Sequence, residues 1–84
     1  MEEEILKEAI VEVLGVYINE IEDDMTFTGD LSADSLDVYQ IVLIVEDKLN
    51  IELKEEDIYE VKTVGQALEL IKKAVKENEW SIKK

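Results

Sequence analysis

Apolar residues recur at spacings of three and four along three segments of the chain, and this pattern constrains the fold more than any other feature. The segments cover 3–14, 35–49 and the stretch from 64 to about 79, where the last helix is expected to fray before Trp80. A fourth, shorter helix is expected over 54–60. The sequence therefore predicts an all-α protein in which a long polar loop joins the first two helices.

The predicted helices have recognisable ends. Gly15 follows the first helix, where a left-handed C-terminal cap suits glycine. Asp34 is a good N-cap for the second helix, and Asp37 places a negative charge near the positive end of its dipole. Thr63 and Gln66 form the T-x-x-Q capping box that opens the last helix. Each signal agrees with the boundary that the apolar periodicity gives.

The second helix carries an apolar run, Ile41 to Val45, that covers its whole circumference. A buried β-strand is the competing interpretation of 38–45, because the segment is rich in β-branched residues. The cap at Asp34 and a length of about fifteen residues favour a helix. Its expected core stripe is Leu36, Tyr39, Val42, Val45, Glu46 and Leu49. The preceding loop should be packed down by its own apolar side chains, Ile18, Ile21, Phe27 and Leu31.

Length and composition exclude most enzyme classes. The 84 residues suffice for a single domain over 1–84, and the absence of Cys and His removes thiolate catalysis, Cys-based zinc sites and the commonest general base. With 9 basic and 22 acidic residues the net charge is −13, so nucleic acid and anionic membranes are poor partners. The acids concentrate in residues 1–63, where 19 acids and 4 bases give −15, while residues 64–84 give +2. We expect a monomeric, cytoplasmic protein that attracts basic protein surfaces and has no membrane insertion, metal site or enzymatic activity.

Ser35 is the residue best placed for chemistry, in the first turn of the second helix after Asp34. A phosphate ester there would meet unpaired backbone N–H groups and the positive end of the helix dipole. An ordinary helix-start serine is the plainer interpretation. A nucleophilic serine is disfavoured, because the chain has no His and no Lys nearer in sequence than Lys48. The position therefore fits a site of modification better than a catalytic residue.

The residues around Ser35 resemble the attachment motif of acyl carrier proteins, since residues 31–37 read LSADSLD. The likeness covers nearly the whole chain. Further residues at the family spacing are Leu14, Gly15, Val16, Phe27, Asp30, Leu31, Thr63, Val64 and Gly65.

This resemblance implies a small four-helix bundle of three longer helices and one short helix. Ser35 would receive 4′-phosphopantetheine from coenzyme A through a phosphopantetheinyl transferase, and the thiol of that arm would carry acyl groups as thioesters. The acidic residues implied in recognition by basic surfaces of acyl-transferring and chain-elongating enzymes are Asp34, Asp37, Glu46 and Asp47. The implied acyl pocket comprises Tyr39, Val42, Leu53, Ile58 and Val61. Because the apolar run surrounds its helix, Leu36 and Leu43 are expected to stay exposed and complete the docking surface.

Four positions depart from the family pattern. Lys54 replaces a common proline, which costs only loop rigidity. Ser32 replaces a usual glycine and should stiffen the loop, and Gln40, on the recognition face, replaces a usual glutamate. Tyr39 is larger than the valine-like residue expected, so it either narrows the acyl path or fills the core.

Ala33 and Asp34 before the serine look like the fatty acid or polyketide type of carrier, and not like the aminoacyl and peptidyl branch. Fatty acid biosynthesis is the expected pathway. A dedicated carrier in a polyketide or other specialised pathway is the alternative within the family. An unmodified acidic helical interaction module is the alternative from a different class. Calcium binding is disfavoured, because residues 23–29 do not follow the EF-hand ligand order.

Overall fold

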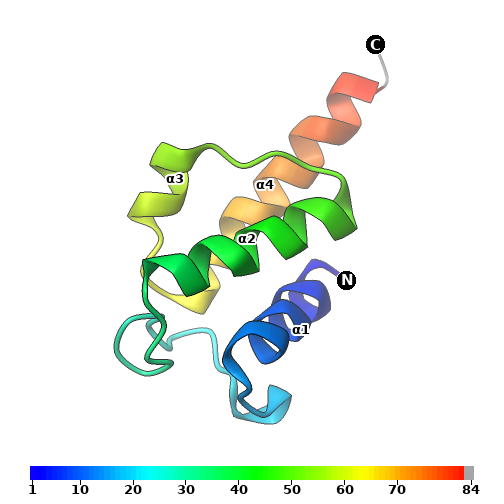
Figure 1. The fold of residues 1–84 in the computed structure, drawn as a ribbon. Helices are drawn as coiled ribbons and strands as arrows, with labels where there is room; N and C mark the ends of the chain where they lie inside the picture. Colours follow the sequence, from blue (N-terminus) through cyan, green and yellow to red (C-terminus); the bar gives the residue numbers. More distant parts are fainter. Residues whose placement is uncertain (83–84) are drawn as a thin grey trace.

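The computed structural model describes residues 1–82, with side chains through residue 77, and its helices follow the predicted order. They are α1 (Glu2–Leu14), a single 3-10 turn η1 (Ile18–Glu20), α2 (Ser35–Leu49), α3 (Glu55–Glu60) and α4 (Val64–Ile82). The three longer helices form the body of the bundle, and the short α3 lies between α2 and α4 along the chain (Figure 1). The expected bundle of three longer helices and one short helix is confirmed.

The capped helix ends are those that the sequence predicts. Gly15 caps α1 with a left-handed φ of 73°, and its N–H donates to the Val11 carbonyl. At the start of α4, Thr63 Oγ1 accepts from the Gln66 N–H, while Gln66 Oε1 accepts from the Thr63 N–H, both at 3.2 Å. The segment 38–45 lies inside α2, so its interpretation as a strand is wrong.

The buried face of α2 agrees only in part with the predicted stripe. Val45 of the stripe is buried, and so is Ile41, which the stripe did not include, whereas Leu36 and Tyr39 lie on the surface. At 100° per residue, Leu36 and Tyr39 lie opposite Ile41, which belongs to the same buried cluster as Leu6, Ala9 and Ile10 of α1. The buried core consists of Leu6, Ala9, Ile10, Ile21, Phe27, Leu31, Ala33, Ile41, Val45, Ile51, Val64, Leu68 and Ile71.

The long loop between α1 and α2 is fastened to the segment between α3 and α4. The Phe27 N–H donates to the Lys62 carbonyl at 3.1 Å, and the Val64 N–H donates to the Met25 carbonyl at 3.0 Å. The Gly65 N–H donates to the Asp23 carbonyl at 2.8 Å, where a Cβ on residue 65 would lie only 3.1 Å from that oxygen. These three backbone bonds hold the loop against the segment between α3 and α4.

The apolar anchors expected in this loop are confirmed for three of four residues. Ile21, Phe27 and Leu31 are buried in the core. Ile18 is exposed instead, because it lies in the turn η1, none of whose residues is buried. The loop therefore packs onto the bundle through its second half.

Helix α4 is longer than expected. It continues to Ile82, past Trp80, where fraying was expected, while the last two residues of the chain lie outside the described residues. The end of α4 projects beyond the other helices (Figure 1). In the part of the chain that the structure describes, no helix has the length and apolar character needed to span a membrane.

Candidate functional site

Ser35 is the first residue of α2, and its side chain is exposed. Asp34 and Asp37 form a reciprocal capping box around it. Asp34 Oδ1 accepts from the Asp37 N–H at 2.9 Å, and Asp37 Oδ2 accepts from the Asp34 N–H at 3.3 Å. The two carboxylates thus fix the helix start and leave the Ser35 hydroxyl facing solvent. The sequence predicts that Asp37 lies near the positive end of the helix dipole. It does not predict that the Asp37 carboxylate also accepts a hydrogen bond from the Asp34 N–H.

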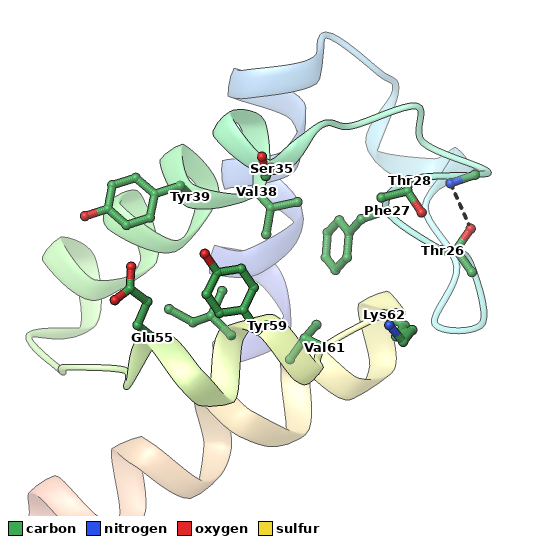
Figure 2. A pocket seen from close by; sticks show the side chains of 12 residues that line it. Thr26, Phe27, Thr28, Ser35, Val38, Tyr39, Glu55, Tyr59, Val61 and Lys62 are labelled. Carbon is green, nitrogen blue, oxygen red and sulfur yellow. Dashed lines mark hydrogen bonds between the residues drawn. The ribbon is translucent and has the colours of Figure 1, made fainter.

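A cavity of about 390 Å³ opens next to Ser35, between α2, α3 and the long loop. It is called the outer cavity here, and its wall includes Phe27, Ser35, Val38, Tyr39, Ile58, Tyr59 and Val61. Figure 2 shows Ser35 at the start of α2, with Tyr39 and Tyr59 coming from the two helices and Phe27 from the loop. Its volume lies in the range of small-molecule sites.

A second, much smaller cavity of about 20 Å³ lies deeper, in the core. This core cavity shares Phe27, Val38, Ile58 and Val61 with the outer cavity. The residues that line it and not the outer cavity include Leu6, Val42, Val45, Leu53 and Leu70. Leu53 and Leu70 also line a third hollow, beside Lys54 and Asp57.

The residues expected to line an acyl pocket are divided between these two cavities. Of these two cavities, Val42 and Leu53 line only the core cavity, Ile58 and Val61 line both, and Tyr39 lines only the outer cavity. Tyr39 is 49% exposed, so it does not fill the core. No sequence pattern assigns Phe27, Val38 or Tyr59 to a pocket, because only the fold brings the loop and α3 against α2.

The expected recognition residues extend along nearly the whole length of α2. Leu36 and Leu43 are exposed apolar residues, 71% and 46% accessible, as expected from the sequence. The acidic and polar side chains around them that are exposed are Asp34, Gln40 and Asp47.

Glu46 and Asp37, the other two recognition residues, are half-buried and bonded within the chain. Glu46 Oε2 accepts from the Leu53 N–H at 2.7 Å, which ties α2 to the segment before α3. This bond explains a carboxylate in the predicted apolar stripe, since it satisfies a backbone donor that is otherwise unpaired. Asp37 serves the helix cap. Both side chains therefore have structural roles in the isolated protein.

Comparison with known proteins defines the class of this site. Residues 4–71 match the family described as the phosphopantetheine attachment site. An exposed serine at a helix start, with a cavity beside it, is consistent with a protein that carries a prosthetic arm.

Acyl carrier proteins of Chlamydia caviae and Wolinella succinogenes are 40% identical to this chain over 70 residues and 41% over 66 residues. These alignments cover 83% and 79% of this chain, and 91% and 87% of the relatives. The solved structure of an acyl carrier protein from Enterococcus faecalis matches with a TM-score of 0.68 and 28% identity, over 88% of this chain and 98% of that one. The chain belongs to the acyl carrier protein family, and its prosthetic group is covalently attached 4′-phosphopantetheine.

Proposed function

We propose that Ser35 Oγ is the attachment point of the 4′-phosphopantetheine arm. The single observation that carries this proposal is the exposed hydroxyl of Ser35 at the first position of α2, on the wall of the outer cavity. The motif LSADSLD around it supports the same residue. As a phosphodiester at this position, the arm would place its negative charge at the positive end of α2.

The residues around Ser35 fit such a group. The side chains of Asp34 and Asp37 turn back to the helix cap, so the serine oxygen is free to form a bond. The cavity beside it has an apolar wall and a polar rim that includes Thr26, Glu55 and Lys62. The bound arm would supply the thiol that forms thioesters, which this chain lacks because it has no cysteine.

The pathway proposed for this carrier is fatty acid biosynthesis in the cytoplasm, with polyketide or other specialised synthesis as the alternative. The similarity to bacterial acyl carrier proteins supports this assignment. Partners are proposed to be a phosphopantetheinyl transferase and acyl-transferring and chain-elongating enzymes with basic surfaces, which the net charge of −13 would attract.

Replacing Ser35 with alanine tests the attachment site. Incubation of the wild-type protein with coenzyme A and a broad-specificity transferase should add the phosphopantetheine mass, and Ser35→Ala should gain none. The variant should keep its fold, with a change well under about 1 kcal/mol, because Asp34 and not Ser35 caps the helix.

Ser32→Ala is the matched control, since Ser32 is an exposed serine three positions earlier in the same motif. It should be loaded like the wild-type protein. Loading of Ser35→Ala, or loss of loading in Ser32→Ala alone, would contradict the assignment to Ser35.

A further inference from the structure

Residues 26–30, in the loop that leads to α2, form a tight turn closed by side-chain hydrogen bonds. Asp30 Oδ2 accepts from the Thr26 N–H at 2.9 Å and from the Thr26 hydroxyl at 3.4 Å. Thr26 Oγ1 in turn accepts from the N–H groups of Gly29 and Asp30, at 3.2 and 3.1 Å. The Thr26 hydroxyl and the Asp30 carboxylate therefore close a ring, and the segment is called the 26–30 turn here.

The 26–30 turn is compact and has a fixed place in the fold. A Cβ on Gly29 would lie only 2.6 Å from Thr26 Oγ1, so the absence of a side chain at this position lets the hydroxyl lie against the backbone. The Phe27 N–H donates to the Lys62 carbonyl at 3.1 Å, which joins the turn to the segment before α4. The turn can therefore transmit a defined position to the residues that follow it.

Two backbone hydrogen bonds connect this turn to the residues that enter α2. The Leu31 N–H donates to the Thr26 carbonyl at 3.1 Å, and the Ala33 N–H donates to the Phe27 carbonyl at 2.7 Å. Ala33 is buried and stands two residues before Ser35. The position of Ser35 is therefore set from its N-terminal side by the turn.

The core supports the first turn of α2 only in part. Ser35 and Leu36 are exposed, Val38 is half-buried, and the first fully buried residue of the helix is Ile41. The capping box keeps this first turn helical, but its two side-chain bonds join residues 34 and 37 only to each other. The place of the serine in the molecule thus depends on the segment that enters the helix.

The 26–30 turn also lies beside the hydroxyl that a transferase must reach. Thr26, Thr28 and Gly29 line the outer cavity together with Ser35 (Figure 2). In the loading reaction Ser35 Oγ gives its proton to the transferase and forms a bond to the phosphorus that bears the pantetheine of coenzyme A. The bond from that phosphorus to the bridging oxygen breaks, and adenosine bisphosphate leaves. Such a step requires close alignment of the attacking oxygen.

We propose that Asp30 and Thr26 are positioning residues for the loading of Ser35. By closing the 26–30 turn, they hold the serine hydroxyl where the transferase can align it with the phosphorus. This inference rests on the proposed attachment at Ser35. Neither residue touches the reacting atoms, and both act through the backbone that enters α2. Their loss should slow the chemical step and leave binding to the transferase nearly unchanged, because the exposed face of α2 is untouched.

Single-turnover loading tests this role. A broad-specificity phosphopantetheinyl transferase is kept in excess over the carrier with saturating coenzyme A, and the gain in mass is followed at rising transferase concentrations. The maximal rate reports the chemical step, and the half-saturating concentration reports binding. Asp30→Ala and Thr26→Val should each lower the maximal rate by about tenfold, since a displacement of about 1 Å can cost up to about 100-fold. The half-saturating concentration should stay close to that of the wild-type protein.

Conservative variants and matched controls separate position from charge and from stability. Asp30→Asn keeps an oxygen that can accept from the Thr26 N–H, and Thr26→Ser keeps the hydroxyl, so both should retain most of the maximal rate. Asp24→Ala removes an exposed acid from the same loop, and Thr28→Val removes an exposed hydroxyl from the same turn. Neither of these two side chains belongs to the ring, so both variants should load like the wild-type protein. Every variant is assayed at a temperature at which circular dichroism shows it to be folded.

The double variant gives a second readout. Because the two side chains close one ring, Thr26→Val combined with Asp30→Ala should load no more slowly than the slower single variant. Losses that multiply would show that the two residues do not act as a unit, which would overturn the proposal.

The remaining outcomes separate this inference from the attachment site. If Ser35 is loaded but Asp30→Ala and Thr26→Val keep the wild-type maximal rate, or if Asp24→Ala loses as much, only this inference fails. It fails also if the half-saturating concentration changes in place of the maximal rate. If Ser35 of the wild-type protein is never loaded, the proposed function itself fails.

Discussion

Ser32 is held in a backbone conformation that L-residues rarely adopt, with φ of 55°. It stands between Leu31 and Ala33, which are both buried, and the Ala33 N–H donates to the Phe27 carbonyl at 2.7 Å. A left-handed residue at this point turns the chain so that both neighbours face the core just before α2 begins. The Ser32 side chain is exposed and makes no hydrogen bond in the described part of the chain that would offset the strain.

Replacing Ser32 with glycine should therefore stabilise the protein. Relief of the left-handed conformation is worth about 1–2 kcal/mol, and the greater freedom of glycine in the unfolded chain removes about 0.5–1 kcal/mol of that gain. We expect a net increase in the free energy of unfolding of roughly 0.5–1 kcal/mol, measured by urea denaturation. Ser32→Ala keeps the strain and should change little, and an equal gain in both variants would show that φ is not the cause.

The faces of α2 illustrate what the sequence could and could not determine. Its bounds and its cap at Asp34 were predictable, because capping and periodicity are local signals. Its buried face was not, because the run from Ile41 to Val45 is apolar on all sides and gives no preferred direction. The sequence predicts that Leu43 stays exposed, but only the packing of the other elements shows that Ile41 is buried.

The candidate site likewise has one part that the sequence predicts and one part that it does not. Ser35 was predictable from its place at a helix start and from the motif around it. The outer cavity was not, because it depends on backbone bonds such as Phe27 N–H to the Lys62 carbonyl, which involve no side-chain pattern. Nothing in the local sequence of the short helix α3 indicates that Tyr59 lines a cavity.

The exposed face of α2 predicts which side chains control the rates of association with partner enzymes and of dissociation from them. Leu43 is an exposed apolar residue and Asp47 is an exposed acid one turn further along. Leu43→Ala should mainly speed dissociation from a phosphopantetheinyl transferase, because it removes buried contact area. Asp47→Asn should mainly slow association, and only at low salt, because it weakens electrostatic steering. Stopped-flow binding at two salt concentrations measures both rates.

Two other substitutions serve as controls for that surface. Ile18→Ala removes an exposed apolar side chain in η1, and Glu52→Gln removes an exposed acid after α2. Neither should alter the rates as strongly as its counterpart on α2. Asp37 is unsuitable for this test, because its carboxylate is part of the helix cap and its loss would also affect folding. Equal effects in all four variants would mean that α2 is not the docking surface.

Across the whole molecule, acidic charge is spread with little local compensation. The net charge is −13, and among the side chains that the structure describes there is one ion pair, Lys7 Nζ to Glu3 Oε2 at 3.1 Å. On the same helix Glu4, Glu8 and Glu12 follow one another at intervals of four, where like charges repel. The radius of gyration is 12.3 Å, so at about 0.01 M salt, with a Debye length of about 30 Å, repulsion acts across the entire protein.

Added salt should therefore raise the melting temperature. Increasing sodium chloride from about 0.01 M to about 0.1 M shortens the Debye length to about 10 Å, and for a domain of this size each kcal/mol of relieved repulsion corresponds to about 4–8 °C. Glu8→Gln removes two like-charge contacts, so it should melt higher at low salt and respond less to added salt. Glu3→Gln removes the same charge from the same helix but breaks the ion pair, so its melting temperature should rise less.

Thermal melts followed by circular dichroism provide the comparison. Melting temperatures independent of salt, or equal gains in the two variants, would show that charge repulsion does not limit the stability of this fold.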